Sequence, residues 1–76
     1  MQFNETHFVK AFGKHLRALR KAQHLSQEHL ANDADIPINQ IGRIERGEIS
    51  TTIGTVFLIA KALNLPVKEL FNFEKN

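Results

Sequence analysis

Residues 37 to 47 carry side chains that can read the edges of base pairs. Arg43 has a guanidinium group that can donate two hydrogen bonds to O6 and N7 of guanine. The amide of Asn39 can pair with N6 and N7 of adenine, and Ile38 can pack against the methyl group of thymine. On a helix with about 100° between successive residues, these three side chains share one face. The chemistry that they predict is recognition of bases in the major groove of DNA.

Gly42 and Arg46 fall on the same face of this predicted helix, whereas Ile41 and Ile44 point the other way. A glycine inside a helix costs about 1 kcal/mol relative to alanine. Close approach of the helix to the floor of the groove would compensate for that cost. The alternative is a glycine that is simply tolerated on an exposed face, and the sequence leaves both interpretations open.

The elements that must hold this face are two short helices with a corner between them. Ser26 is a suitable N-cap for the first helix, and Pro37 disfavours helical geometry in the residue before it, so that this helix ends by Asp35. The second helix restarts at Pro37 or Ile38 and stops at Gly47. The two helices have small apolar faces that can meet, formed by Leu30, Ala31 and Ala34 and by Ile41 and Ile44. This pattern predicts a helix-turn-helix over about residues 26–46.

Three further helices are expected around this unit. The first covers about residues 4–24 with Asn4 as its N-cap, and Phe3 and Phe8 have the spacing of a hydrophobic staple. The fourth runs from about residue 52 to residue 64, and a short fifth helix covers residues 67–71. The predicted fold is all-α, a compact bundle of five helices.

Composition limits the classes of protein that the chain can represent. Its 76 residues, 42% of them hydrophobic, suit one domain over residues 1–76 with a compact core. The sequence has no cysteine, so a disulfide framework and a cysteine-based zinc site are excluded. The longest apolar run, residues 56–60, is too short to span a membrane, and we see no signal peptide. We therefore expect a cytoplasmic protein.

Catalytic and metal-binding patterns do not stand out in this sequence. There is no evident pairing of a nucleophile with a base, no glycine-rich phosphate loop and no CxxC motif. The four histidines lack the spacing and acidic neighbours of a metal site: His7, His15, His24 and His29. We expect a protein that is not an enzyme and that binds no metal or cofactor.

Charge is distributed unevenly along the chain. Residues 1–24 carry five Lys or Arg and one Glu, whereas residues 25–49 carry two Arg and five Asp or Glu. A basic first segment suits an anionic partner such as DNA. A solvated helix face explains the same charges, so that charge alone does not decide the function.

With these features, the chain resembles the lambdoid repressor and Cro-like helix-turn-helix family, also called XRE-like, over residues 12–71. That resemblance implies a five-helix DNA-binding domain, usually a dimer and usually a transcriptional regulator. The matching pieces occur in the family's order: Phe12-Gly13, Leu16-Arg17, Leu19-Arg20, Leu25-Ser26-Gln27-Glu28, Leu30-Ala31, Ile41, Arg43-Ile44-Glu45-Arg46-Gly47, Ile59-Ala60, Ala62-Leu63 and Leu70-Phe71.

The resemblance also assigns roles to residues outside the base-reading face. Gln27 matches the family's glutamine that grips a phosphate beside a helix N-terminus. Arg20 and Glu45 match a basic residue and a glutamate whose buried ion pair would fix the angle of the recognition helix. An exposed pair of little energetic value is the alternative. Further candidates for phosphate contacts are Gln40, Arg46, Ser50, Thr51 and Thr52.

Two departures from the family pattern affect the recognition helix. Asp35 stands where the family usually has glycine, and aspartate tolerates left-handed geometry at a modest cost. Pro37 stands where the family often has a capping serine or threonine, which affects the aim of Ile38 and Asn39. The acidic residues near this helix predict weak non-specific affinity for DNA.

The sequence leaves two functions in competition. The first is a transcriptional regulator, such as a Cro-type repressor or a restriction–modification controller, that binds double-stranded DNA as a homodimer on a near-palindromic operator. The second is a module for a protein partner, an antitoxin bound to its toxin or an adaptor. Both would use the same apolar patch, which we expect to contain Leu58, Val67, Phe71 and Phe73.

Overall fold

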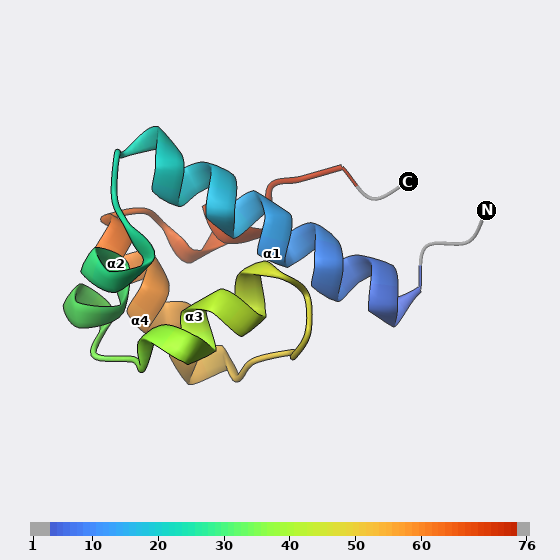
Figure 1. The fold of residues 1–76 in the computed structure, drawn as a ribbon. Helices are drawn as coiled ribbons and strands as arrows, with labels where there is room; N and C mark the ends of the chain where they lie inside the picture. Colours follow the sequence, from blue (N-terminus) through green and yellow to red (C-terminus); the bar gives the residue numbers. More distant parts are fainter. Residues whose placement is uncertain (1–3, 75–76) are drawn as a thin grey trace.

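Four α-helices and one short 3-10 helix make up residues 4–74, the part of the chain that the computed structural model describes (Figure 1). In chain order they are α1 Glu5–Ala22, α2 Gln27–Ala34, α3 Ile38–Glu45, α4 Ile53–Leu63 and η1 Val67–Phe71. No strand occurs in this described part, and the all-α prediction is confirmed. The expectation of a fifth α-helix is wrong, because the last helix has 3-10 geometry. Its five residues follow a proline, and short segments of this kind commonly close hydrogen bonds across three residues.

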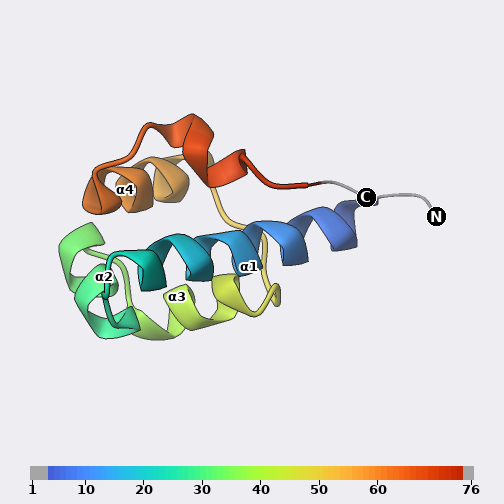
Figure 2. The same cartoon turned by 90° about the horizontal axis from the view of Figure 1, so that it is seen from above.

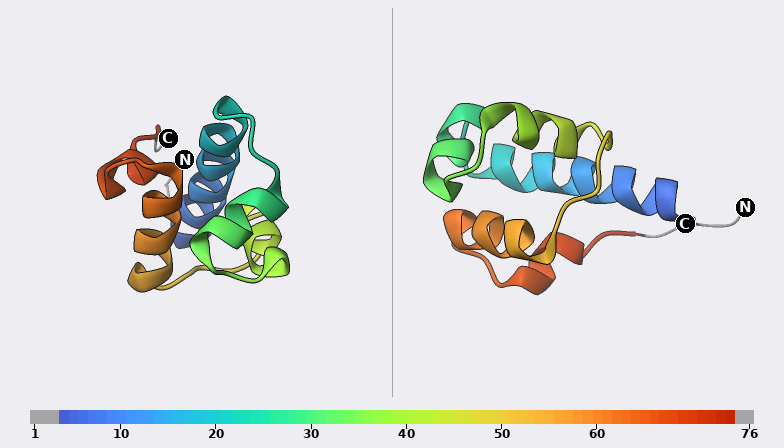
Figure 3. Two further views of the ribbon diagram at one scale, coloured as in Figure 1. Left: turned by 90° about the vertical axis from the view of Figure 1, so that its left-hand side faces the viewer. Right: turned by 90° about the horizontal axis from the view of Figure 1, so that it is seen from below.

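Helix α1 runs along the length of the molecule. It packs against α3 on one side and against η1 on the other, and α2 contacts both α3 and α4. The view from above shows α1 between the α2–α3 pair and the layer of α4 and η1 (Figure 2). The end-on view shows the three groups of helices around one centre (Figure 3). That centre is filled by buried apolar side chains: Phe12, Leu16, Leu30, Ala31, Ala34, Ile36, Ile41, Ile44, Val56, Ile59, Ala60, Leu63 and Leu70.

Three of the helices begin at a side-chain N-cap, and the sequence predicts two of these caps, Asn4 and Ser26. The side-chain oxygen of Asn4 accepts a hydrogen bond from the backbone N–H of His7 (3.0 Å). Ser26 caps α2 in the same way (2.9 Å to the amide of His29), and Thr52 caps α4. Each contact satisfies a backbone donor that the helix itself leaves unpaired. The proposed staple between Phe3 and Phe8 lies outside the described residues, because these begin at residue 4.

The corner between α2 and α3 is formed by one left-handed residue and one buried side chain. Asp35 has φ 59° and ψ 46°, and Ile36 after it is buried in the core. The backbone N–H of Ile36 donates to the carbonyl oxygen of Ala31 at 2.9 Å, which closes the end of α2. Pro37 then precedes α3 without a side-chain cap. The predicted break in the helix at this corner is confirmed.

The left-handed conformation of Asp35 gives a prediction about stability. The Asp35→Gly variant is expected to raise the free energy of unfolding by about 1 kcal/mol, because glycine takes this conformation without the clash of a Cβ atom. Urea denaturation measures the change. The Asp33→Gly variant, which removes the same charge from within α2, should lose stability instead. An Asp35→Gly protein that is no more stable than the parent would contradict the prediction.

Helices α1 and α3 approach each other closely at Gly13, where no side chain separates the two backbones. A Cβ atom on Gly13 of α1 would overlap the carbonyl oxygen of Ile44 and would lie 2.8 Å from that of Glu45. Only glycine fits at such a contact without moving a helix. The backbone of α1 therefore directly supports the last turn of α3.

Candidate nucleic-acid interface

The three predicted base-reading side chains lie together on the exposed face of α3. Ile38 is 49% exposed, although it is a large apolar residue, and Asn39 and Arg43 are also exposed. On the opposite face, Ile41 and Ile44 are fully buried in the core. The apolar face of α3 thus holds the helix in place, and the other face presents an apolar side chain, an amide and a guanidinium group to solvent.

Gly42 does not belong to this exposed face. It is buried, and the side chains of Arg46 and Gln27 lie next to it. A Cβ atom at this position would be 3.0 Å from Nη1 of Arg46 and 3.7 Å from Oε1 of Gln27. The interpretation of Gly42 as a glycine tolerated on an exposed face is therefore wrong, whereas its close approach to the groove floor stays a prediction. The absence of a side chain at Gly42 leaves room for the side chains of Gln27 and Arg46 beside the helix.

A buried ion pair joins the end of α1 to the end of α3. Nε and Nη2 of Arg20 donate to the two carboxylate oxygens of Glu45, at 2.7 and 2.9 Å. The hydrogen bond to Glu45 raises the pKa of Arg20, although burial acts in the opposite direction, so the guanidinium group remains charged. Nη1 of Arg20 also donates to the carbonyl oxygen of Leu25 (2.8 Å), and the amide nitrogen of Gln27 donates to Glu45 (3.0 Å). One network thus connects α1, the start of α2 and the end of α3.

A shallow hollow of about 340 Å³ opens above this network, beside the N-terminus of α2. It is lined by Arg17 of α1, by Arg46 after the end of α3 and by Gln27, the first residue of α2. Two guanidinium groups beside the amides of a helix N-terminus suit a phosphate group. Arg17 was missed in the sequence, because its position off the apolar face of α1 does not reveal which helix lies next to it.

Glu48 forms ion pairs with Arg43 of α3 and with Arg46, the residue after α3. Its carboxylate accepts hydrogen bonds from Nε of Arg46 at 2.6 Å and from Nη2 at 3.4 Å. Nε of Arg43 lies 3.7 Å from the same carboxylate. The hydrogen bond from Arg46 lowers the pKa of Glu48, so this side chain is ionised at neutral pH. All three side chains are about half exposed, which keeps them within reach of a ligand.

The hydroxyl groups between α3 and α4 differ in their availability. Ser50 is exposed, and the hydroxyl of Thr52 is engaged in capping α4 and in a 3.1 Å hydrogen bond to the hydroxyl of Thr55. The hydroxyl oxygen of Thr51 is buried and has no hydrogen-bond partner among the described residues. The phosphate contact of Thr51 stays a prediction, and it would require this hydroxyl to turn out of its buried position. Gln40 lies half-buried on α3.

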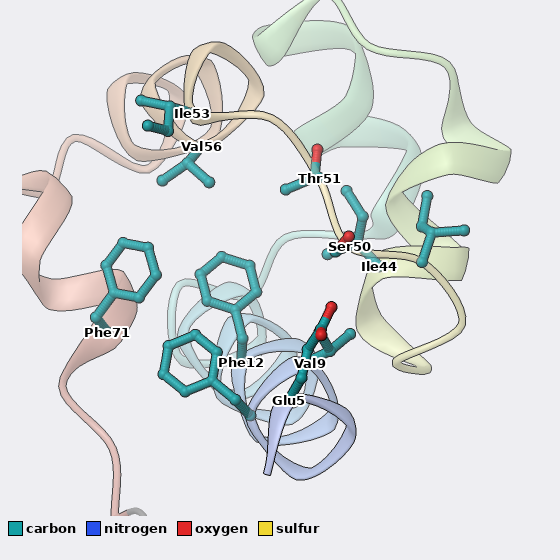
Figure 4. Close-up of a pocket in the computed structure, with 11 residues that line it drawn as sticks. Glu5, Val9, Phe12, Ile44, Ser50, Thr51, Ile53, Val56 and Phe71 are labelled. Atoms are coloured by element: carbon teal, nitrogen blue, oxygen red, sulfur yellow. The ribbon is translucent and has the colours of Figure 1, made fainter.

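An apolar groove of about 290 Å³ lies between α1, α4 and η1. In the close-up, Phe12 of α1, Val56 of α4 and Phe71 of η1 face one another across it (Figure 4). Beside the groove the surface of α4 and η1 is unusually apolar. The exposed side chains there are Ile53 (88%), Phe57 (54%), Leu58 (39%), Val67 (40%) and Phe71 (37%), and we call this set the apolar patch.

The apolar patch contains three of the four residues that the sequence analysis assigned to a dimer interface. Phe73 is the exception, because it is partly buried and its ring packs against Phe8 and His15, with centroids 5.4 and 5.6 Å apart. Ile53 and Phe57 were missed in the sequence. Since α4 carries apolar residues on all sides, the pattern alone does not show which of them face the core.

Residues 4–74 contain no group of three histidine, aspartate or glutamate side chains arranged to hold a metal ion. Across the same residues, no helix has both the length and the apolar character needed to cross a membrane.

The described fold, with an exposed polar helix after a tight corner, is that of a helix-turn-helix protein. The HTH_3 model, described as helix-turn-helix, matches residues 16–70, and the chain belongs to this family. It is a DNA-binding transcription regulator and not an enzyme. The resemblance to the XRE-like family that the sequence motifs indicated is confirmed.

Among known proteins, the chain is similar to control proteins and to a controller protein of known structure. It is 39% identical over 57 residues to the control protein C.SmaI of Serratia marcescens, covering 75% of this chain and 68% of that protein. It is 35% identical over 63 residues to the control protein C.BamHI of Bacillus amyloliquefaciens, covering 82% and 78%. The crystal structure of the restriction-modification controller protein C.AhdI from Aeromonas hydrophila superposes with a TM-score of 0.82 and 36% identity, covering 83% of this chain and 96% of that one.

Proposed function

We propose that this protein is a cytoplasmic, homodimeric controller of transcription that reads a near-palindromic operator with α3. The observation that carries the proposal is the exposed face of α3, where Ile38, Asn39 and Arg43 are presented together and the buried Arg20–Glu45 pair fixes the helix. Arg43 reads guanine, Asn39 reads adenine and Ile38 packs on a thymine methyl group. The similarity to the restriction-modification controller C.AhdI supports this specific kind of regulator.

Phosphate contacts fix the register of α3 in the groove. The hollow beside α2 supplies two guanidinium groups and the amide of Gln27, and the N-terminus of α2 adds the positive end of its dipole. Ser50, which is exposed, and Gln40, which is half-buried on α3, are further candidates for such contacts. Such contacts add affinity that depends on salt but carry no sequence information.

The dimer is formed through the apolar patch. Patches of exposed apolar side chains on small proteins commonly mark a surface that is covered by a partner. A two-fold axis through α4 would bring the same residues of two copies together. Two copies of α3 would then meet successive major grooves, about 34 Å apart along the DNA.

Selection from a random duplex library at about 100 mM salt tests the DNA-reading function, because contacts to phosphate alone are weakened at this ionic strength. A near-palindromic motif with guanine in each half-site is the expected result. If the library yields no enriched motif while the protein remains folded, the proposed operator recognition is wrong.

Charge placed in the apolar patch should prevent dimer formation. The Phe57→Lys variant is expected to sediment as a monomer and to bind the selected operator at least about tenfold more weakly, because each half-site is then bound alone. The Ala18→Lys variant, with its added charge on an exposed part of α1, should remain a dimer. A wild-type protein that sediments as a monomer both with and without DNA would contradict the dimer.

An antitoxin or adaptor is the second candidate, and the apolar patch is the observation that favours it. A protein partner would bury Ile53, which is 88% exposed. Such an exposed apolar side chain within a patch is typical of a surface that a partner covers. In that case Phe57→Lys would abolish the complex with the partner and leave DNA binding by the isolated protein unchanged. The two candidates are thus separated by the same variant.

A further inference from the structure

Glu48 is held in place by the backbone as well as by its side chain. Gly47 has φ 72° and turns the chain back over the end of α3, and the backbone N–H of Glu48 donates to the carbonyl oxygen of Arg43 at 2.9 Å. A Cβ atom on Gly47 would meet Lys10 of α1, which shows that this turn is packed against α1. The carboxylate of Glu48 is therefore aimed at α3 by a fixed turn and not by a mobile loop end.

The carboxylate of Glu48 accepts hydrogen bonds from guanidinium N–H groups that could otherwise donate to DNA. Nε and Nη2 form one edge of the Arg46 guanidinium group, and both donate to Glu48. Phosphate oxygens bind guanidinium groups through this same kind of paired contact. Arg43, the proposed guanine reader, also has its Nε beside this carboxylate. The negative charge of Glu48 thus lies beside the positive charges of Arg43 and Arg46, the two arginines proposed to contact DNA.

We propose that Glu48 acts as an internal competitor of DNA. In the free protein its carboxylate pairs with Arg43 and Arg46, and DNA displaces this carboxylate when it binds. The inference rests on the proposed function, because it requires that α3 meets DNA. Displacement has two consequences. Binding must first break the contacts to Glu48, and the released carboxylate then lies near phosphates that repel it. Glu48 therefore lowers the affinity for DNA and reduces its dependence on salt.

The Glu48→Gln variant tests this competition, since it keeps the shape of the side chain and removes its charge. The probe is a labelled duplex of mixed sequence, about 20 base pairs long, titrated by fluorescence anisotropy at several salt concentrations. We expect binding about two- to fivefold tighter than wild type, the range that an exposed ion pair can account for. The slope of log K against log salt should steepen by about 0.9, as for one additional neutralised phosphate.

Two comparisons separate this mechanism from a general effect of charge. Glu69→Gln makes the same change in net charge in η1, which packs against α1 and α4, and it should leave affinity almost unchanged. In a chain that already carries Arg43→Ala and Arg46→Ala, Glu48→Gln should change the affinity for DNA no more than Glu69→Gln does. The reason is that the carboxylate no longer has an arginine partner in that chain.

Each outcome decides between the alternatives. Tighter binding that disappears in the background without the two arginines supports the competition. If Glu48→Gln binds as the wild type does, or has the same effect with and without the arginines, Glu48 is not a competitor. Weaker binding would mean that Glu48 orients the arginines toward DNA, which also overturns the proposal. If neither the wild type nor any variant binds duplex DNA, the proposed function fails together with it.

Discussion

Replacing Arg20 with alanine is expected to lower the free energy of unfolding by about 3–5 kcal/mol, because Glu45 is left as a buried charge without its partner. The variant also lacks the link from α1 to the carbonyl oxygen of Leu25 before α2. For a domain of this size such a decrease is a large part of the total stability. Urea denaturation monitored by circular dichroism measures it, and a variant that is already unfolded in buffer also meets the expectation.

The matched control for Arg20 lies one turn earlier in the same helix. Arg17 is exposed, and Arg17→Ala should change stability by less than about 0.5 kcal/mol. Replacing both partners of the buried pair with leucine should recover part of the stability, because no uncompensated charge remains. If Arg20→Ala is as stable as Arg17→Ala, the ion pair does not support the recognition helix.

Replacing Arg43 with alanine is expected to relax the preference for guanine at one position of each half-site. Removing this side chain should weaken binding to the selected operator by about 1–3 kcal/mol in each half-site, or about 5- to 150-fold, while binding to mixed-sequence DNA changes much less. The fold should be unaffected, because this side chain is about half exposed and contributes nothing to the core. Library selection and operator titration of the variant measure both effects.

A suitable control for Arg43 is Lys14→Ala, which removes one positive charge from an exposed position on α1. It should lower affinity for all duplexes to a similar small extent without altering the selected motif. If the Arg43→Ala protein selects the same motif with the same guanine, another side chain reads that base. Arg46 would then be the first alternative, since it is the other guanidinium group at this end of α3.

The backbone of the helix-turn-helix could be predicted because its signals are local. Caps, prolines and apolar spacing depend on neighbours within one or two turns of the chain. The corner at Asp35 is an example, since Pro37 and the small apolar faces on either side sufficed to locate it. The 3-10 geometry of η1 was not predicted, because five residues after a proline carry no signal that distinguishes it from an α-helix.

The parts of the site that could not be predicted depend on side chains from distant segments. Gly42 is covered by Arg46 and by Gln27, and the second of these side chains comes from another helix. The hydroxyl of Thr51 is buried in the loop before α4, and Arg17 joins the site because α1, the first residue of α2 and the end of α3 line the same hollow. The spacing of residues along one helix predicts the faces of that helix alone. It does not predict which side chains of other helices contact those faces.

The contact of Gly13 with the backbone of α3 has a consequence for how the protein and its target adapt to each other. Because two backbones already touch, the recognition helix cannot move inward, and the buried ion pair opposes its movement outward. The protein then behaves as a stiff template, and any mismatch in spacing or curvature must be absorbed by the double helix. We therefore expect base steps that the protein never touches to influence affinity through their flexibility, with pyrimidine–purine steps favoured wherever the duplex has to bend.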